Sequence, residues 1–264
     1  MEKHLNSFRK ARTALWSLLF LSFLSWIGCG DLDALKKEAE EAEKAPTFLI
    51  LCDLTTSVDA SSIDSVAAHA ANIFRKLPRP SNAIFLPVEA NQFSQELLRH
   101  QKSHPQKPSE RRAMEKKEEE LAVEIEQVIK DRYAKINVEL GKKDPARSCI
   151  ITSISRAQDI IKRAHHSSLL ILSDMVVECN TSLLGELYFT ERRFKQAQAL
   201  LENWEPDFDL SKVHKVTIIP STTGEIQDHG FISSVKLIQT WKEIFRKLNY
   251  QGDLHFQPWV PDTL

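Results

Sequence analysis

Residues 47–57 read Thr-Phe-Leu-Ile-Leu-Cys-Asp-Leu-Thr-Thr-Ser, an apolar run that ends at a single carboxylate. Unbroken hydrophobicity over this length is typical of a strand buried on both faces of a parallel sheet. Thr55 and Ser57 follow Asp53 at alternate positions, at the end of the strand where open α/β sheets place their ligand sites. Carboxylate and hydroxyl oxygens are hard donors, which suit Mg²⁺ or Mn²⁺ better than zinc or copper.

Two later stretches extend this pattern. Residues 152–157 (Thr-Ser-Ile-Ser-Arg-Ala) lead into an amphipathic helix, and residues 169–174 (Leu-Leu-Ile-Leu-Ser-Asp) form an apolar run that ends at Asp174. Together with residues 53–57, these motifs resemble the metal-ion-dependent adhesion site of von Willebrand factor A-type (VWA) domains, with Thr55 in place of the first Ser. The resemblance spans about residues 45–248.

The resemblance implies both a metal site and a partner. It assigns five ligands to Mg²⁺ or Mn²⁺, some of them acting through water: Asp53, Thr55, Ser57, Thr152 and Asp174. A protein partner would complete the coordination with an acidic group, as in adhesion-type domains. The chain is then expected to be a binding module without catalytic residues. Met175 stands where Gly is frequent in the family.

Two other interpretations stand beside this one. Asp53 and Asp174 follow apolar strands, where Asp is also a common helix N-cap, and in that case the chain is a metal-free scaffold of the same fold. A metal-assisted, phosphatase-like hydrolase would use Asp53 on a similar sheet. Haloacid-type phosphatases, however, carry a second acid two positions after the first, where this chain has Thr55.

The periodicity of the remaining chain predicts strands that alternate with amphipathic helices. That order indicates an α/β fold, a doubly wound and mainly parallel sheet with helices on both faces. A polar insert covers about residues 90–147, and within it residues 111–140 form a long helix with one apolar stripe. This helix either lies against the sheet or stands out as a partner-binding arm. Residues 250–264 are expected to pack as an extended strap.

Composition and cysteine content narrow the function. The formal net charge of −1 provides no electrostatic attraction to nucleic acid, so no nucleic-acid partner is expected. Neither G-x-G-x-x-G nor G-x-x-x-x-G-K-[ST] occurs. The four cysteines form no C-x-x-C pair, and a bridge between Cys149 and Cys179 stays open as an alternative to free thiols.

The amino-terminal 45 residues predict attachment to a membrane. Residues 1–12 are basic and residues 14–28 are almost purely apolar, as in a signal peptide. Gly28-Cys29 resembles a bacterial lipobox, which makes Cys29 the expected lipidation site; an uncleaved anchor is the alternative. Residues 30–45 are a charged tether. Both alternatives place the VWA-like domain, residues 46–264, in the bacterial cell envelope outside the cytoplasm.

Overall fold

The structure is a computed structural model, and it describes residues 44–55, 60–88, 96–105, 107–140, 149–177, 194–220 and 233–257. The chain separates into two units, Met1–Glu43 and Lys44–Leu264, and all described residues belong to the second. Residues 1–43, which hold the predicted signal peptide and most of the tether, lie outside the described part, as does Cys29.

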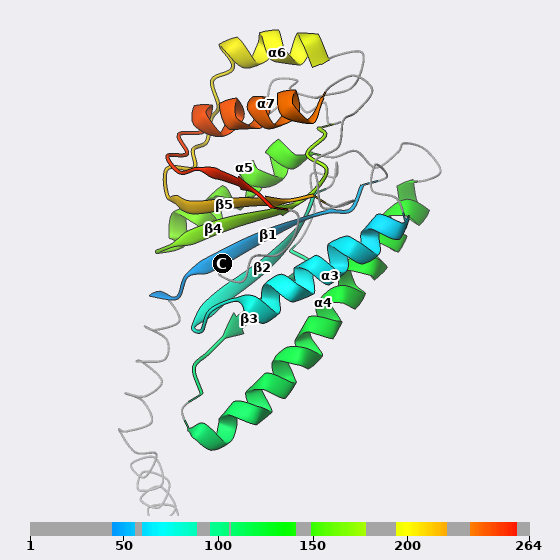
Figure 1. The fold of residues 1–264 in the computed structure, drawn as a ribbon, viewed down its shortest axis with the longest axis vertical. Helices are drawn as coiled ribbons and strands as arrows, with labels where there is room; N and C mark the ends of the chain where they lie inside the picture. Colours follow the sequence, from blue (N-terminus) through cyan, green and yellow to red (C-terminus); the bar gives the residue numbers. More distant parts are fainter. Residues whose placement is uncertain are drawn as a thin grey trace, which may run out of the picture. The chain divides into compact units, whose positions relative to one another are not determined.

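A six-stranded, mainly parallel sheet forms the centre of the second unit (Figure 1). In sequence the strands are β1 (Thr47–Asp53), β2 (Ser81–Val88), β3 (Leu98–Lys102), β4 (Ser167–Leu172), β5 (Val213–Ile219) and β6 (Leu254–Phe256). In space their order is β3-β2-β1-β4-β5-β6, and β3 is the antiparallel member. β1 pairs in parallel with both β2 and β4 and is buried at every residue. The predicted fold class, a doubly wound and mainly parallel α/β sheet, is confirmed.

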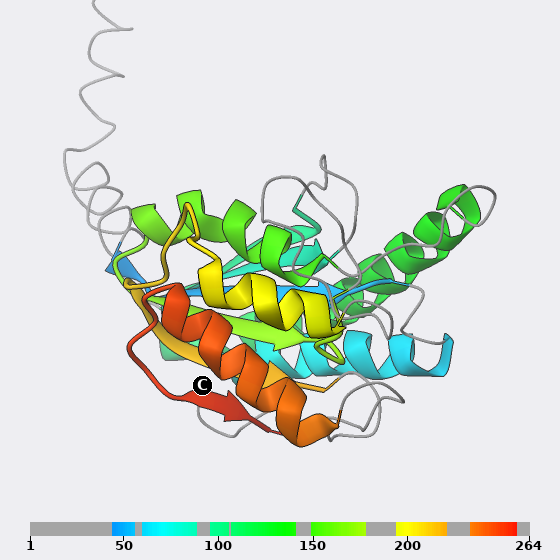
Figure 2. The ribbon, with the colours of Figure 1, turned by 90° about the horizontal axis from the view of Figure 1, so that it is seen from above.

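Helices cover both faces of this sheet. On one face lie α3 (Ala60–Lys76) and α4 (Arg111–Leu140), the latter preceded by the short 3₁₀ helix η1 (Pro108–Glu110). On the other lie α5 (Ile150–Arg163), α6 (Phe194–Asn203) and α7 (Ser234–Lys247). In Figure 2, which is seen from above, α6 (yellow) and α7 (orange) lie in front of the sheet. Alternate residues of β1 enter the two cores: Leu49 and Leu51 pack under α5 and α7, whereas Ile50 and Cys52 pack under α3.

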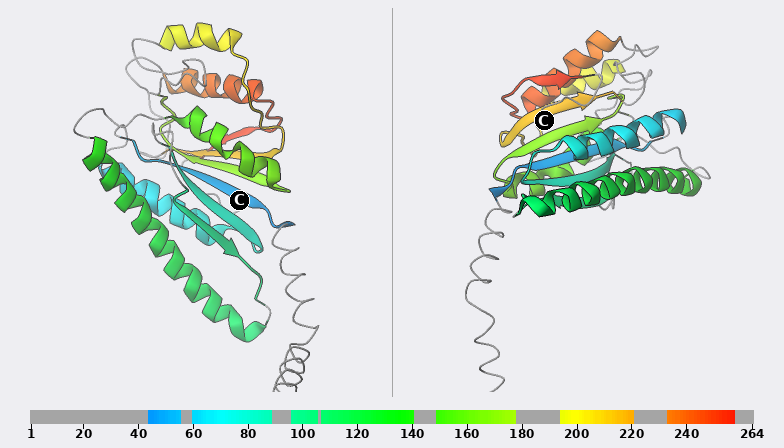
Figure 3. Two further views of the ribbon diagram at one scale, coloured as in Figure 1. Left: turned by 180° about the vertical axis from the view of Figure 1, so that it is seen from behind. Right: turned by 60° about the horizontal axis from the view of Figure 1, so that its bottom comes forward.

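The long insert helix α4 packs along α3 (Figure 3). Its predicted bounds, residues 111–140, match the structure. Its buried stripe contributes to the same core as α3 and consists of Ala122, Ile125, Ile129 and Ile136. Ion pairs flank this stripe, among them Arg75–Glu119 at 2.6 Å and Lys130–Asp64 at 2.8 Å. Of the two placements left open by the sequence, the structure therefore shows α4 held against the domain.

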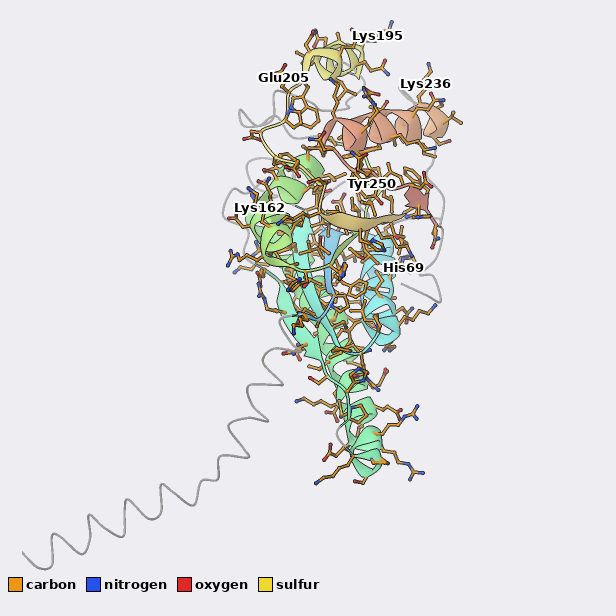
Figure 4. All side chains as sticks on the ribbon, turned by 90° about the vertical axis from the view of Figure 1, so that its left-hand side faces the viewer. His69, Lys162, Lys195, Glu205, Lys236 and Tyr250 are labelled. Atoms are coloured by element: carbon orange, nitrogen blue, oxygen red, sulfur yellow. The ribbon has the colours of Figure 1, made fainter. Side chains whose placement is uncertain are left out.

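The structure corrects two expectations at the edges of the sheet. Within the polar insert of about residues 90–147, the sequence predicted only the helix over residues 111–140, but residues 98–102 form β3 and pair with β2. Residues 250–264 were expected to form an extended strap, but three of them form β6, which pairs with β5. The tyrosine that precedes this strand, Tyr250, lies beside β5 (Figure 4), and its hydroxyl accepts a hydrogen bond from Val216 N at 2.9 Å.

Candidate functional site

The strand order reverses between β1 and β4, because the chain leaves β1 toward β2 on one side and leaves β4 toward β5 on the other. In open α/β sheets, ligands bind outside the carboxyl ends of the strands at such a switch point. Asp53 is the last residue of β1, and Ser173 and Asp174 directly follow β4. Because Cys52 pairs with Leu172, the residues that follow this pair meet across the switch point.

Asp53 is a fully buried carboxylate that accepts hydrogen bonds from hydroxyl groups on both oxygens. Its Oδ1 accepts from Thr55 Oγ1 at 2.7 Å and from Thr55 N at 3.2 Å. Its Oδ2 accepts from Ser173 Oγ at 2.6 Å. Short hydrogen bonds of this kind to an ionised carboxylate are roughly twice as strong as neutral ones. Of the sequence-predicted residues, Asp53 and Thr55 are thus in direct contact.

The thiol of Cys52, one residue before Asp53, lies in the same buried surroundings. Cys52 is free and fully buried in β1. Burial raises the pKa of this thiol far above its ordinary value, and the negative charge of Asp53 adds to the increase. A thiol kept protonated and out of solvent is a poor nucleophile and a poor metal ligand. Cys52 therefore serves as a small core residue.

The turn after β4 is held by two consecutive side-chain caps. Ser173 Oγ accepts a hydrogen bond from Met175 N at 2.9 Å, and Asp174 Oδ1 accepts one from Val176 N at 2.9 Å. Between them Met175 is fully buried and adopts a φ of 66°. Such a left-handed conformation costs a residue with a Cβ about 1–2 kcal/mol. Gly adopts it without that cost, which gives a physical reason for the frequent Gly at this position in the family that the sequence resembles.

The first turn of α5 lies at the same edge of the sheet. Ser153 Oγ donates to the carbonyl of Pro87, near the end of β2, at 3.4 Å, and Pro87 pairs with Cys52 across the strands. Thr152, the predicted ligand, is 7% exposed in this turn. The helix begins at Ile150, so Thr152 belongs to its first turn, whereas the sequence pattern placed it just ahead of the helix. Ser57, the remaining predicted ligand, lies outside the described residues.

Cys149 occupies the N-cap position of α5 and is disulfide-bonded. Cys29 and Cys179 both lie outside the described residues, so the bridge between Cys149 and Cys179 stays a prediction. A disulfide in this position ties down the start of the helix that carries Thr152. Disulfides persist in oxidising compartments such as the cell envelope.

The donor set fits a hard divalent cation. Asp53, Thr55 and Ser173 bring one carboxylate and two hydroxyls together, and Asp174 is next to Ser173 in the chain. All of these donors are oxygen, which Mg²⁺ and Mn²⁺ prefer. Across the described ranges, no three His, Cys, Asp or Glu side chains gather in a way that could hold a metal ion. Among the described residues, an ion beside Asp53 and Asp174 would need hydroxyl groups and water to complete its coordination, and Mg²⁺ normally keeps several waters.

Sequence reasoning missed two members of this arrangement. Ser173 contacts Asp53 directly, and its signal was its position immediately before Asp174 at the end of an apolar run. Trp241 on α7 reaches the turn after β4, where its Nε1 donates to the carbonyl of Met175 at 2.8 Å. Nothing in the sequence around Trp241 distinguishes this bond from ordinary burial on the apolar face of a helix. We define the candidate site as Asp53, Thr55, Ser173 and Asp174.

Comparison with protein-family models and with curated proteins found no match. Among the residues that the structure describes, none of the helices combines the length and the apolar character needed to cross a membrane. The assignment of function therefore depends on the geometry of the candidate site and on the sequence motifs.

Proposed function

We propose that this protein is a membrane-tethered, VWA-like binding module that recognises a protein partner through Mg²⁺ or Mn²⁺ at the carboxyl edge of its sheet. The observation that carries the proposal is the buried carboxylate of Asp53, which two hydroxyl groups contact at the point where the strand order reverses. Removing a carboxylate from water is costly unless charge and hydrogen bonds compensate. A divalent cation supplies that compensation.

In this proposal each residue has a distinct task. Asp53 and Thr55 would hold the ion from β1, with Ser57 and Thr152 as further ligands that the resemblance implies. Asp174 would act from the turn after β4, directly or through water, with Ser173 keeping Asp53 oriented. When bound, the cation would offer a coordination position that an acidic side chain of the partner can occupy. Recognition would then require an acidic partner group and would be lost with the metal.

The amino-terminal tether is part of the same proposal. The basic and apolar residues 1–28, followed by Cys29, are expected to attach the chain to a bacterial membrane by lipidation or as an uncleaved anchor. The chain enters the domain at Lys44 and β1, that is, at the amino edge of the parallel strands. The candidate site lies at the opposite edge of the sheet, at the end of β1, and the proposal places the partner there.

Thermal unfolding of the full chain in detergent tests whether a divalent cation binds at the candidate site. An ion present at 100 times its dissociation constant should stabilise the folded state by about 2.7 kcal/mol relative to EDTA. This gain should disappear in Asp53→Asn and persist in Asp159→Asn, a matched change of an exposed acid on α5. Equal gains in both variants, or no gain in the wild type with either Mg²⁺ or Mn²⁺, would reject metal binding at Asp53.

A metal-free scaffold of the same fold is the second candidate. It is favoured by one observation, namely that both oxygens of Asp53 already accept hydrogen bonds from hydroxyl groups. Affinity capture from membrane extracts separates the two candidates. In the metal-dependent case EDTA releases the captured protein, and Asp53→Asn fails to capture it. In the metal-free case both treatments leave capture unchanged.

A further inference from the structure

A continuous chain of hydrogen bonds connects α7 to Asp53 through the turn after β4. The Nε1 of Trp241 donates to Met175 O at 2.8 Å, and Met175 N donates to Ser173 Oγ at 2.9 Å. Ser173 Oγ in turn donates to Asp53 Oδ2 at 2.6 Å. All four residues have 0% exposure, so water does not compete for these bonds.

Only the serine hydroxyl in this chain of bonds can change its direction, because an N–H group always donates and a carbonyl or carboxylate oxygen accepts. A serine hydroxyl has one hydrogen to donate, and its lone pairs accept. Because Met175 N occupies the acceptor side of Ser173 Oγ, the hydroxyl hydrogen is left to point at Asp53. Met175 holds this orientation only while its φ stays at 66°. The indole of Trp241 fixes the carbonyl of the same residue and so opposes its return to a more common conformation.

We propose that Trp241 is a positioning residue for the candidate site: its indole N–H holds the Met175 turn so that Ser173 and Asp174 stay in place beside Asp53. The metal-binding consequence rests on the proposed function, whereas the positioning itself can be measured without any metal. Asp174 is included because its carboxylate caps Val176 N in the same turn.

The competing explanation is that Trp241 only fills the core. Its ring lies 5.9 Å from that of Phe245, and both are buried in the core beneath α7. Two matched substitutions separate packing from positioning. Trp241→Phe keeps an aromatic ring and removes the N–H donor. Phe245→Leu removes packing one turn further along α7 and leaves the indole donor intact.

Hydrogen exchange followed by mass spectrometry on the full chain in detergent provides the decisive measurement. In Trp241→Phe, the amides of residues 173–177 should exchange about 10-fold faster than in the wild type, as expected for the loss of one buried hydrogen bond. Phe245→Leu should leave this segment at the wild-type rate even when it lowers global stability by a similar amount. Equal acceleration in the two variants would show that Trp241 acts through packing alone and would overturn the proposal.

A second pair of variants keeps the test valid if Trp241→Phe does not fold. Ser173→Ala breaks the chain of hydrogen bonds at its centre and should speed the exchange of Met175 N–H about 10-fold, whereas Ser173→Thr retains the hydroxyl and should restore protection. If Met175 N–H exchanges at the same rate in Ser173→Ala and Ser173→Thr, the proposal is refuted. Titration with Mn²⁺ adds a separate readout: Trp241→Phe should weaken binding about 10-fold. A wild type that binds neither Mn²⁺ nor Mg²⁺ would refute the proposed function, and the exchange contrast would still decide the role of Trp241.

Discussion

Replacing Lys102 with Met should destabilise the protein far more than removing any exposed lysine. Lys102 ends the edge strand β3, and its side chain is 2% exposed. Its Nζ donates to the carbonyls of Phe74, Arg75 and Leu77 at 3.1, 3.1 and 3.0 Å. The first two carbonyls belong to the last turn of α3 and that of Leu77 directly follows it; a helix leaves acceptors unsatisfied at this end, and a positive charge is favourable there.

The expected loss follows from counting the bonds that have no replacement. Phe74 O also accepts from Leu77 N at 3.3 Å, so it retains a partner when Lys102 is removed. The loss therefore comes from the two bonds that Nζ donates to Arg75 O and to Leu77 O. Each contributes about 1.5 kcal/mol because the donor is charged. Glu118, the ionic partner of Lys102 at 3.3 Å, keeps a two-bond contact with Arg79 at 2.6 and 2.8 Å. We therefore expect a loss of about 3 kcal/mol, or a fall in Tm of about 6–12 °C.

Urea unfolding followed by circular dichroism measures this difference, and Lys130→Met is the matched control. Lys130 also forms an ion pair, with Asp64 at 2.8 Å, but both side chains are well exposed, at 39% and 68%. Exposed pairs of this kind contribute about 0–1 kcal/mol. A loss in Lys102→Met that is no larger than the loss in Lys130→Met would refute the argument that Lys102 caps α3.

Two further predictions concern the disulfide and the response to acid. Cys149→Ser, which removes the disulfide bond, should lower the free energy of unfolding by about 2–4 kcal/mol. A reductant should lower the stability of the wild type to that of this variant. A variant as stable as the oxidised wild type would contradict a structural role for the bond. Burial lowers the pKa of His69 from its ordinary 6.5, so the unfolded chain takes up a proton in acid before the folded protein does. The free energy of unfolding should therefore fall as the pH drops through about 6.5. In His69→Gln, the midpoint of urea unfolding should depend less on pH than in the wild type. Midpoints that change equally with pH in the two proteins would exclude His69 as a source of acid sensitivity.

The central strands and the insert helix could be predicted because their buried residues form long, regular apolar patterns in the sequence. β1 is apolar from Phe48 to Cys52, and α4 repeats its apolar residues with helical spacing from Leu121 to Ile136. The edge strands carry no such pattern. β3 reads Leu-Arg-His-Gln-Lys, in which half-buried and exposed residues alternate before the buried Lys102, and β6 has only three residues. Both are strands because a neighbouring strand offers them backbone hydrogen bonds, which a single segment of sequence does not reveal.

The sequence predicts those residues of the candidate site that directly follow an apolar strand. Asp53 and Thr55 belong to one continuous segment, and the structure joins them by a hydrogen bond. Ser173 could be placed near Asp53 only once the parallel pairing of β1 with β4 was known. The bond from Trp241 is harder still, because it spans 66 residues of sequence and depends on how α7 lies across the sheet. Local patterns therefore indicate the residues with the chemistry, while tertiary packing selects those that orient them.

The thiol of Cys52 gives this protein an internal reporter of motion at its centre. Because the side chain is fully enclosed in β1 and its pKa is raised, an alkylating reagent can reach it only when the sheet separates. The rate at which Cys52 is labelled under native conditions then measures the free energy of opening the central strand. A ligand that binds beside Asp53, one residue further along, should slow that labelling in proportion to its occupancy.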